Sequence, residues 1–400
     1  MQKHYLIDHR FLFLFGYIFY LFTPYIVGKS NWFDGYPGID LFQGVFNLIP
    51  EKQISIYLIV SLAWLPAFYL GHFLFDRLNL SKTGLHKFNS SELSLSIPVI
   101  TPVFIFVLFL FAFLARNSLL GGYSSYDVGA RGKMSTLLVL FNFFMIYQLV
   151  SRQKISYLFI AGTAMTAFLL LSMGGRMYVF ETFIIMLIYK TSFSIRSWSK
   201  GQIFLFGLIC FLIGSAFGLW RMGSSFGLEG AAYSFFAEPT FTWFSTISFL
   251  TSNEVQFFNW PSNFLTSFLN LIPNTIISLK PYIISLERMA VGYKNPLGAD
   301  SAWSTLVINF GSIGSCFFIM FTGFMLNFLR YKSYQSRFWA TYYIMVCGII
   351  PFQFFRDGFY ILNKQLFFNF LLLPCFILLL LKTMLYLQKR WILVNEAVEV

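Results

Sequence analysis

Six arginines carry the strongest chemical signal in this sequence. They stand at the ends of long apolar runs or in the segments between them, and they are Arg116, Arg131, Arg176, Arg221, Arg288 and Arg356. A guanidinium group stays charged and offers a planar pair of donors that holds two oxygen atoms at once. Several such groups around one cavity would suit a bound phosphate or pyrophosphate. The alternative is that each arginine reaches lipid head groups independently.

Arg176 has the most constrained position of the six. It ends the sequence Ser-Met-Gly-Gly-Arg (172–176), a turn so short that the side chain must lie at a membrane boundary. Glu181 follows in the next apolar run, about 140° further round a helix, so the two are not expected to pair directly. A carboxyl group inside a span is a functional hypothesis by default. A polar packing contact with another helix explains Glu181 equally well.

Any general base on the outer side has to be a carboxylate. All four histidines map to the inner side of the predicted topology, which argues against histidine-based acyl transfer outside. The outer carboxylates are Asp127, Glu229, Glu238, Glu254, Glu287, Asp300 and Asp357. Glu238 stands out because it interrupts the apolar run 231–249 and precedes Pro239, although a helix-end carboxylate would look the same. The sequence holds no metal-ligand spacing and no Walker-type phosphate loop.

The elements that position these side chains are membrane helices. Hydrophobic residues make up 57% of the 400 residues and charged residues 11%, and phenylalanine alone occurs 54 times. Ordinary soluble domains carry about 25% charged residues, so this composition excludes a soluble fold. The short alternating segments of an outer-membrane barrel are missing.

About ten spans are predicted from runs long enough to cross the hydrocarbon layer. They are 11–27, 54–75, 97–115, 134–150, 155–172, 174–190, 203–220, 303–329, 338–355 and 365–384. With the N-terminus inside, every predicted cytoplasmic segment carries Lys or Arg, as the positive-inside rule requires. The net charge of +12 therefore reflects topology and not nucleic-acid binding. No small-residue cleavage site follows the first run, which we expect to be an uncleaved signal anchor.

We expect an all-α integral membrane protein with 10–12 transmembrane helices in one polytopic domain, residues 1–400, and with both termini cytoplasmic. Residues 221–300 form one large outer loop in this topology. Its apolar runs could be interfacial or re-entrant helices, or an extra hairpin of spans. Glu238-Pro239 and Pro273-Asn274 interrupt those runs and favour the first interpretation. Four arginines at or near outer helix ends could converge on one cavity, and they are Arg116, Arg176, Arg221 and Arg356.

The arrangement resembles the O-antigen polymerase (Wzy-type) family, also called oligosaccharide repeat-unit polymerases. The likeness rests on the span count with both ends inside, the Gly-Gly-Arg turn at 174–176 and the large late outer loop. It also rests on Asn-Pro-Leu-Gly-Ala-Asp-Ser (295–301) and on Asn-Phe-Gly-Ser-Ile-Gly (309–314). The likeness covers most of the chain as architecture and a few dozen residues as motif. Gly311 and Gly314 would also suit close helix packing.

The resemblance implies a metal-independent glycosyltransferase of lipopolysaccharide biosynthesis at the outer face of the bacterial inner membrane. Its donor would be a growing glycan on undecaprenyl pyrophosphate, and its acceptor a repeat unit on a second such lipid. The pyrophosphate already activates the bond, so no cofactor is implied. A chain-length regulator is a partner implied by the resemblance alone.

The resemblance also gives the candidate residues their roles. Glu238 would accept the proton of the attacking hydroxyl, and Arg176 and Arg221 would stabilise the leaving pyrophosphate. The remaining candidates would bind pyrophosphate or sugar, and they are Arg116, Arg131, Arg288, Arg356, Asn309 and Trp243. Trp260 and Tyr233 would offer further stacking faces to sugars.

Four other functions remain open. A flippase for lipid-linked sugars would also need a cationic cavity, but it predicts positive residues deep within several spans. Other polyprenyl-phosphate glycosyltransferases place an acidic pair in the first outer loop, where this chain has only the separated Asp34 and Asp40. O-antigen ligases share the plan, but an outer-loop histidine is expected in them and is missing here. A structural subunit of an envelope complex is the last alternative.

Overall fold

The computed structural model of the chain describes residues 7–30, 32–78, 100–118, 128–194, 197–222, 227–272, 277–296 and 298–398. The structure is 80% helical, and the described residues contain no strand. The helices of the first half are α1 (His9–Tyr17), α2 (Thr23–Lys29), α3 (Ile39–Phe46), α4 (Glu51–Arg77), α5 (Ile100–Leu114), α6 (Val128–Val150), α7 (Tyr157–Ser172), α8 (Arg176–Ile188) and α9 (Lys200–Met222). Those of the second half are α10 (Leu228–Thr242), α11 (Phe244–Ser252), α12 (Ser262–Ser267), α13 (Leu286–Met289), α14 (Ala302–Ser333), α15 (Arg337–Ile349), α16 (Gln353–Arg356), α17 (Phe359–Asn363) and α18 (Leu373–Val398). Wider π-helical turns occupy Ile18–Phe22, Tyr189–Phe193 and Lys364–Leu372.

Six helical segments of the described chain are long and apolar enough to cross a bilayer. They are His9–Lys29, Glu51–Arg77, Gly129–Val150, Lys200–Trp220, Ala302–Ser333 and Phe359–Gln388. The chain is therefore an α-helical membrane protein. The other four predicted spans also coincide with helices, namely α5, α7, α8 and α15, but these are shorter. The count of about ten and the orientation stay predictions.

Two long helices, α4 and α14, make the most extensive helix–helix contact in the described part of the chain. Glycines let their backbones approach, as small residues do in membrane helix pairs. A methyl group on Gly71 would lie 2.0 Å from the Met320 carbonyl oxygen, and one on Gly323 would lie 2.2 Å from that of Phe68. The Trp64 indole also donates to the Ser315 hydroxyl across the pair at 3.0 Å.

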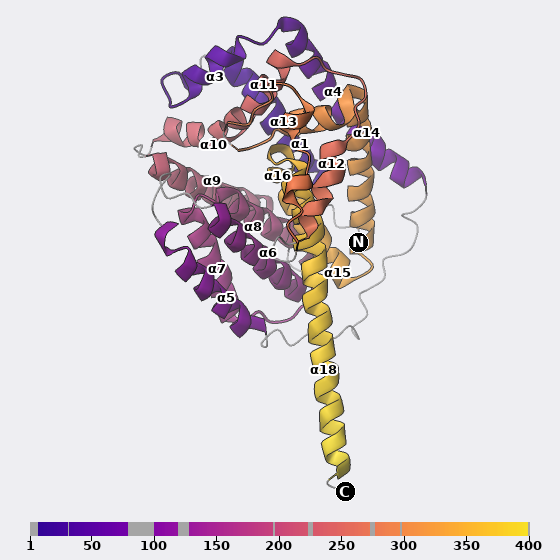
Figure 1. Cartoon of the computed structure of the whole chain (residues 1–400). Coiled ribbons are helices and arrows are strands. Elements are labelled where there is room, and N and C mark those ends of the chain that lie inside the picture. The colour runs from indigo at the N-terminus through magenta and orange to yellow at the C-terminus, as the bar shows by residue number, and fades with distance from the viewer. Residues whose placement is uncertain are drawn as a thin grey trace.

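The segment 227–300 contributes α11 and α13 to the part of the molecule that holds α3, opposite the end from which α18 projects (Figure 1). It contains the short helices α10 to α13, and none of its described residues belongs to a segment long enough to span a membrane. Glu238-Pro239 does not end a helix, because α10 continues to Thr242. Pro273-Asn274 lies outside the described residues.

The Asn-Phe-Gly-Ser-Ile-Gly sequence (309–314) lies within α14 and binds the segment 227–300 through its backbone. Gly311 has a positive φ of 77°, which interrupts the helix and suits glycine. Its neighbour Phe310 accepts a backbone hydrogen bond from Asn259 at 3.1 Å, and Ser312 donates one to Gln256 at 2.8 Å. A methyl group on Gly311 would lie 2.5 Å from the Phe257 carbonyl oxygen. The glycine is needed for close backbone packing here.

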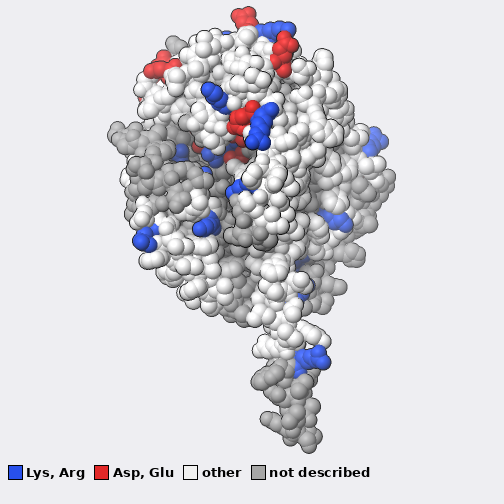
Figure 2. Space-filling model, viewed as in Figure 1, with Lys and Arg blue, Asp and Glu red and all other residues white. Residues whose placement is uncertain are grey.

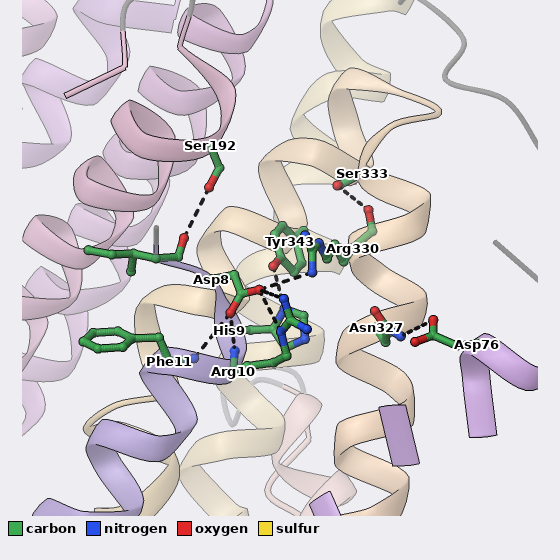
Figure 3. Close-up of polar contacts among 11 residues, drawn as sticks. Asp8, His9, Arg10, Phe11, Asp76, Ser192, Asn327, Arg330, Ser333 and Tyr343 are labelled. Carbon is green, nitrogen blue, oxygen red and sulfur yellow. Dashed lines mark hydrogen bonds and ion pairs between the residues drawn. The ribbon is translucent and has the colours of Figure 1, made fainter. Parts of the chain in front are cut away.

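A polar cluster joins the N-terminal helix to α14 and α15 (Figure 3). Asp8 caps α1 by accepting from the Arg10 backbone at 3.0 Å, and its carboxylate pairs with the guanidinium groups of Arg10 at 2.7 Å and Arg330 at 3.2 Å. Burial alone would raise the pKa of Asp8, but the hydrogen bond from Arg10 and the nearby positive charges hold this pKa below its usual value. His9 meets the Tyr343 hydroxyl at 2.7 Å. The cluster therefore fixes the first span in the bundle.

Candidate active site

A cavity of about 740 Å³ brings together four of the charged side chains singled out in the sequence. Arg131 comes from α6, Arg176 from α8 and Arg356 from α16, and Glu238 faces them from α10. Three arginines and one glutamate give the lining a net charge of +2. Basic and acidic atoms meet in a recess of the otherwise mostly uncharged surface, in the region of α8, α10 and α16 (Figures 1 and 2).

Arg176 is held by a tight turn and by a neighbouring helix. Gly174 adopts a positive φ of 79°, and the Gly175 amide donates to the Leu170 carbonyl at 2.7 Å, so α7 ends and α8 begins at Arg176. The Arg176 guanidinium donates to the Ser234 hydroxyl of α10 at 3.2 Å. A cation at a helix N-terminus opposes the helix dipole at a cost of roughly 0.3–1 kcal/mol. A bound anion would offset that cost.

Gly218 of α9 creates the space that the Arg176 side chain occupies. A methyl group there would lie 2.2 Å from Arg176 Nη1 and 2.0 Å from the Ser234 hydroxyl oxygen. Both distances are far below van der Waals contact, so only glycine permits this arrangement. The position of Arg176 therefore depends on three helices, α8, α9 and α10.

Arg356 and Glu238 form the closest ion pair in the cavity. Arg356 Nε lies 2.6 Å from Glu238 Oε1, and the two side chains are 20% and 35% exposed. The Arg356 guanidinium also lies 3.8 Å from the Asp357 carboxylate and donates to the Met177 sulfur at 3.2 Å. Burial alone would lower the pKa of Arg356, but Glu238 and Asp357 outweigh it and raise this pKa. Arg356 is thus a fixed positive charge between two carboxylates.

Asp357 is buried behind Arg356, at 4% side-chain exposure. Burial raises its pKa, although the Arg356 charge opposes this shift. Asp300 approaches the same segment, because a methyl group on Gly358 would lie 2.7 Å from its Oδ2 atom. Asp300 accepts from the Tyr293 hydroxyl at 2.6 Å and from the Asn295 amide at 2.8 Å. The 295–301 motif therefore supports the wall of the cavity at α16.

Aromatic side chains form much of the remaining lining. The π-helical turn of the first span contributes Phe19 and Tyr20, and the others are Tyr178, Phe180, Phe235, Phe241, Phe244 and Phe352. Ring faces of this kind pack against apolar groups and against the C–H faces of sugars. The cavity thus combines a cationic wall with an apolar one, as an amphiphilic anion would require.

Two of the other predicted arginines, Arg116 and Arg288, do not line this cavity. Arg116 begins the short 3-10 turn Arg116–Ser118 that follows α5, with its guanidinium 4.5 Å from the ring centroid of Phe113 in α5. Arg288 is exposed on α13. Arg221 ends α9 at the backbone level, and its side chain lies outside the described residues. Arg131, Arg176 and Arg356 are the predicted arginines that meet.

Two predicted substrate-binding residues are buried instead. Trp243 is fully buried, packs on Phe46 with ring centroids 5.4 Å apart, and donates to the Tyr57 hydroxyl at 3.0 Å. No face of its ring is left for a sugar, so its predicted stacking role is corrected to a core role. Asn309 is also buried, and its side-chain oxygen accepts from the Phe264 amide at 2.8 Å. Its role in the structure is to hold α12 against α14.

The stacking prediction for the two other aromatic residues is not supported by their positions. Tyr233 is 2% exposed and donates to the Pro37 carbonyl at 2.6 Å. Trp260 is 75% exposed and does not line the cavity.

Several lining residues were not predicted from the sequence. Ser234 precedes Glu238 by four residues, and this spacing places both on one face of a helix. This spacing predicts that Ser234 lies beside Glu238 if residues 231–249 are helical. Tyr20 and Tyr178 lie within apolar runs, and no local sequence feature predicts that they line a site.

The described residues hold no group of three or more His, Cys, Asp or Glu side chains that could bind a metal.

The fold and the cavity define an α-helical membrane protein with a cationic, aromatic-walled site. Comparison with known proteins adds no family to this description. No protein-family model, curated protein or solved structure matches the chain.

Proposed function

We propose that this protein is a polymerase of lipid-linked oligosaccharide repeat units. It would transfer a glycan from undecaprenyl pyrophosphate to a second lipid-linked repeat unit, at the outer face of the bacterial inner membrane. The observation that carries the proposal is the convergence of Arg131, Arg176 and Arg356 with Glu238 on one cavity. The topology expected for this function has about ten spans and both termini in the cytoplasm.

The cationic wall would bind the pyrophosphate of the donor. A pyrophosphate that joins a lipid to a sugar carries two negative charges, which match the net charge of +2 on the lining. Arg176 and Arg131 can each hold two phosphate oxygens in a planar fork. Because these groups are already in position, they stabilise the charge that develops as the pyrophosphate leaves. The aromatic wall would face the sugars and the first isoprene units.

The Glu238–Arg356 pair supplies the proton acceptor. The hydroxyl oxygen of the acceptor sugar attacks the anomeric carbon of the donor, and the carbon–oxygen bond to the pyrophosphate breaks. The bonding electrons leave with the lipid pyrophosphate, and the hydroxyl proton moves to Glu238. Glu238 then loses its charge, so Arg356 becomes available to the departing pyrophosphate. Neither a nucleotide nor a metal takes part in this proposal.

The proposal is tested by giving the purified protein only synthetic repeat-unit undecaprenyl pyrophosphate in detergent. Electrophoresis should show a ladder of longer lipid-linked glycans without nucleotide or added metal. Arg116→Ala provides a matched control, because Arg116 lies outside the cavity. If no ladder forms while the protein moves the lipid between the leaflets of vesicles, the cavity belongs to a transporter.

A further inference from the structure

Helix α14 changes its surroundings at Gly311. Every residue from Ala302 to Asn309, before this position, is buried in the protein. After it, one face of the helix is open, because Ile313, Phe317 and Phe321 are 42%, 57% and 56% exposed. Their four-residue spacing places these side chains on one face. An open apolar face on a membrane span contacts acyl chains, so the lipid contact of α14 begins at the kink.

The part of α14 after the kink has the length of a bilayer crossing. From Ser312 to Lys332 the helix rises about 30 Å, which is the thickness of a hydrocarbon core. Arg330 and Lys332 stand in its last turn, and such basic side chains suit the polar interface. A crossing of this length puts the Gly311 kink at one boundary of the hydrocarbon layer, whichever side is cytoplasmic.

The segment 256–260 supplies hydrogen bonds that the kink removes from α14. The Ile313 amide donates to the Phe257 carbonyl at 3.1 Å. The Asn259 side chain donates to the Ile308 carbonyl at 3.2 Å. A broken helix is tolerated in a membrane only where the freed backbone groups find partners in the protein. These bonds fix the segment to α14 at the level of the kink.

Three large apolar rings of this segment are left uncovered. Phe257, Phe258 and Trp260 are 72%, 62% and 75% exposed. A methyl group on Gly314 would lie 3.7 Å from Phe258 Cδ1, so the Phe258 ring lies beside α14 just after the kink. Contact of these rings with water is unfavourable by roughly 25 cal/mol for each Å² of apolar surface. Aromatic side chains, tryptophan above all, are enriched where a membrane meets water.

We propose that Phe257, Phe258 and Trp260 insert into the bilayer interface and hold the kink of α14 at that depth. The phenylalanine rings contact acyl chains and continue the lipid-facing surface of α14. The Trp260 indole lies at the level of the head groups, where its N–H group finds acceptors. This role agrees with the position of Trp260 outside the cavity. The proposal is independent of the glycosyltransferase function.

The test measures the depth of spin labels on the full-length protein in phosphatidylcholine vesicles. The natural cysteines are first replaced by alanine, and they are Cys210, Cys316, Cys347 and Cys375. A nitroxide is then attached to Phe258→Cys, Phe321→Cys or Glu254→Cys. Oxygen concentrates in hydrocarbon and a nickel chelate stays in water, so the ratio of their collision rates with a label reports its depth.

We expect the oxygen-to-nickel ratio at Phe258→Cys to be several-fold higher than at Glu254→Cys and lower than at Phe321→Cys. Glu254 is the matched control, because it is exposed and charged and lies four residues from Phe258. Phe321 represents the lipid-facing surface of α14.

Two outcomes would overturn the proposal. If nickel reaches the label at 258 as readily as the label at 254, the rings face water. If neither reagent reaches it, protein covers the surface, as a second copy of the chain would. Should the cysteine-free protein fail to fold, brominated lipids are used to quench the tryptophan fluorescence of the protein with its natural cysteines. Trp260→Phe should then lower the quenched fraction, and an unchanged fraction would contradict the proposal.

Discussion

Arg356 Nε lies 2.6 Å from Glu238 Oε1, in a cavity that also contains Arg131 and Arg176. The pair joins α16, which follows α15, to α10 of the segment 227–300. It places a carboxylate that can take up a proton against a cation that can hold an anion.

Glu238→Gln should lower the rate of chain extension by roughly 10²–10⁴-fold, because an amide cannot accept the hydroxyl proton. Binding of the lipid pyrophosphate should persist, since the three cavity arginines remain. Initial rates of ladder formation and binding of labelled lipid, measured on the same preparation, check both parts. Loss of binding together with turnover would indicate that Glu238 only holds Arg356 in place.

Arg176→Ala should reduce chain extension by roughly 10²–10³-fold, as expected for loss of one group that stabilises developing charge. Arg176→Lys should also be impaired, because a point charge does not replace a planar fork. Glycan length in membranes is the readout, with immunoblotting to establish that each variant is inserted. Normal glycan length in Arg176→Ala would remove this residue from the mechanism.

Gly218→Ala should impair activity without touching a charged residue. The added methyl group would lie 2.2 Å from Arg176 Nη1, so the guanidinium must move. A displacement of this size can lower the rate by roughly 10²-fold. Gly207→Ala is the matched control on the same helix, because no atom lies within 4 Å of the added methyl group. Equal activity of the two variants would show that the position of Arg176 is not critical.

Asp8 should make the stability of the protein depend on pH in the acid range. Its pKa in the folded protein is held below the ordinary value of 3.8, so its contribution is fully present above that pH. The contribution is lost as the pH falls through the lowered pKa. Thermal unfolding between acid and neutral pH should show this loss in the unmodified protein.

Asp8→Asn should unfold at a lower temperature at neutral pH and should lose part of the acid dependence. The expected destabilisation is about 1–3 kcal/mol, since two guanidinium groups lose a charged partner. Asp40→Asn serves as the control, because Asp40 is exposed at the start of α3. An unchanged acid dependence in Asp8→Asn would assign that dependence to other carboxylates.

The class of protein and the positions of the apolar helices could be predicted from the sequence, but the packing of these helices against one another could not. Each of the ten predicted apolar runs coincides with helix in the described residues, because burial in lipid demands such runs whatever the packing, and six of these helical segments are long enough to cross a bilayer. The Gly-Gly turn likewise predicted where Arg176 begins α8. Arg131 and Arg356 line the same cavity as Arg176, whereas Arg116 does not. This difference depends on how α6, α8 and α16 pack, which no local sequence pattern encodes.

Tertiary packing also determines that the Trp243 ring is buried and that Glu238 lies inside a helix. An aromatic residue in the predicted outer loop suggested a sugar-stacking face, but Phe46 and Tyr57 enclose the ring. Pro239 suggested a helix end at Glu238, but α10 extends to Thr242. Pro239 removes the N–H that would have bonded back to Phe235 and its ring crowds that carbonyl, and the packing of α10 against α9 offsets this cost.

The most direct test of the account is the product balance of a single reaction. The purified protein is given one synthetic repeat unit on undecaprenyl pyrophosphate, and mass spectrometry follows all lipid species with time. The account predicts one free undecaprenyl pyrophosphate for each repeat unit joined, with no nucleotide consumed and with the release nearly abolished in Glu238→Gln. Recovery of the lipid-linked repeat unit unchanged, under conditions where the folded protein binds it, would contradict the account.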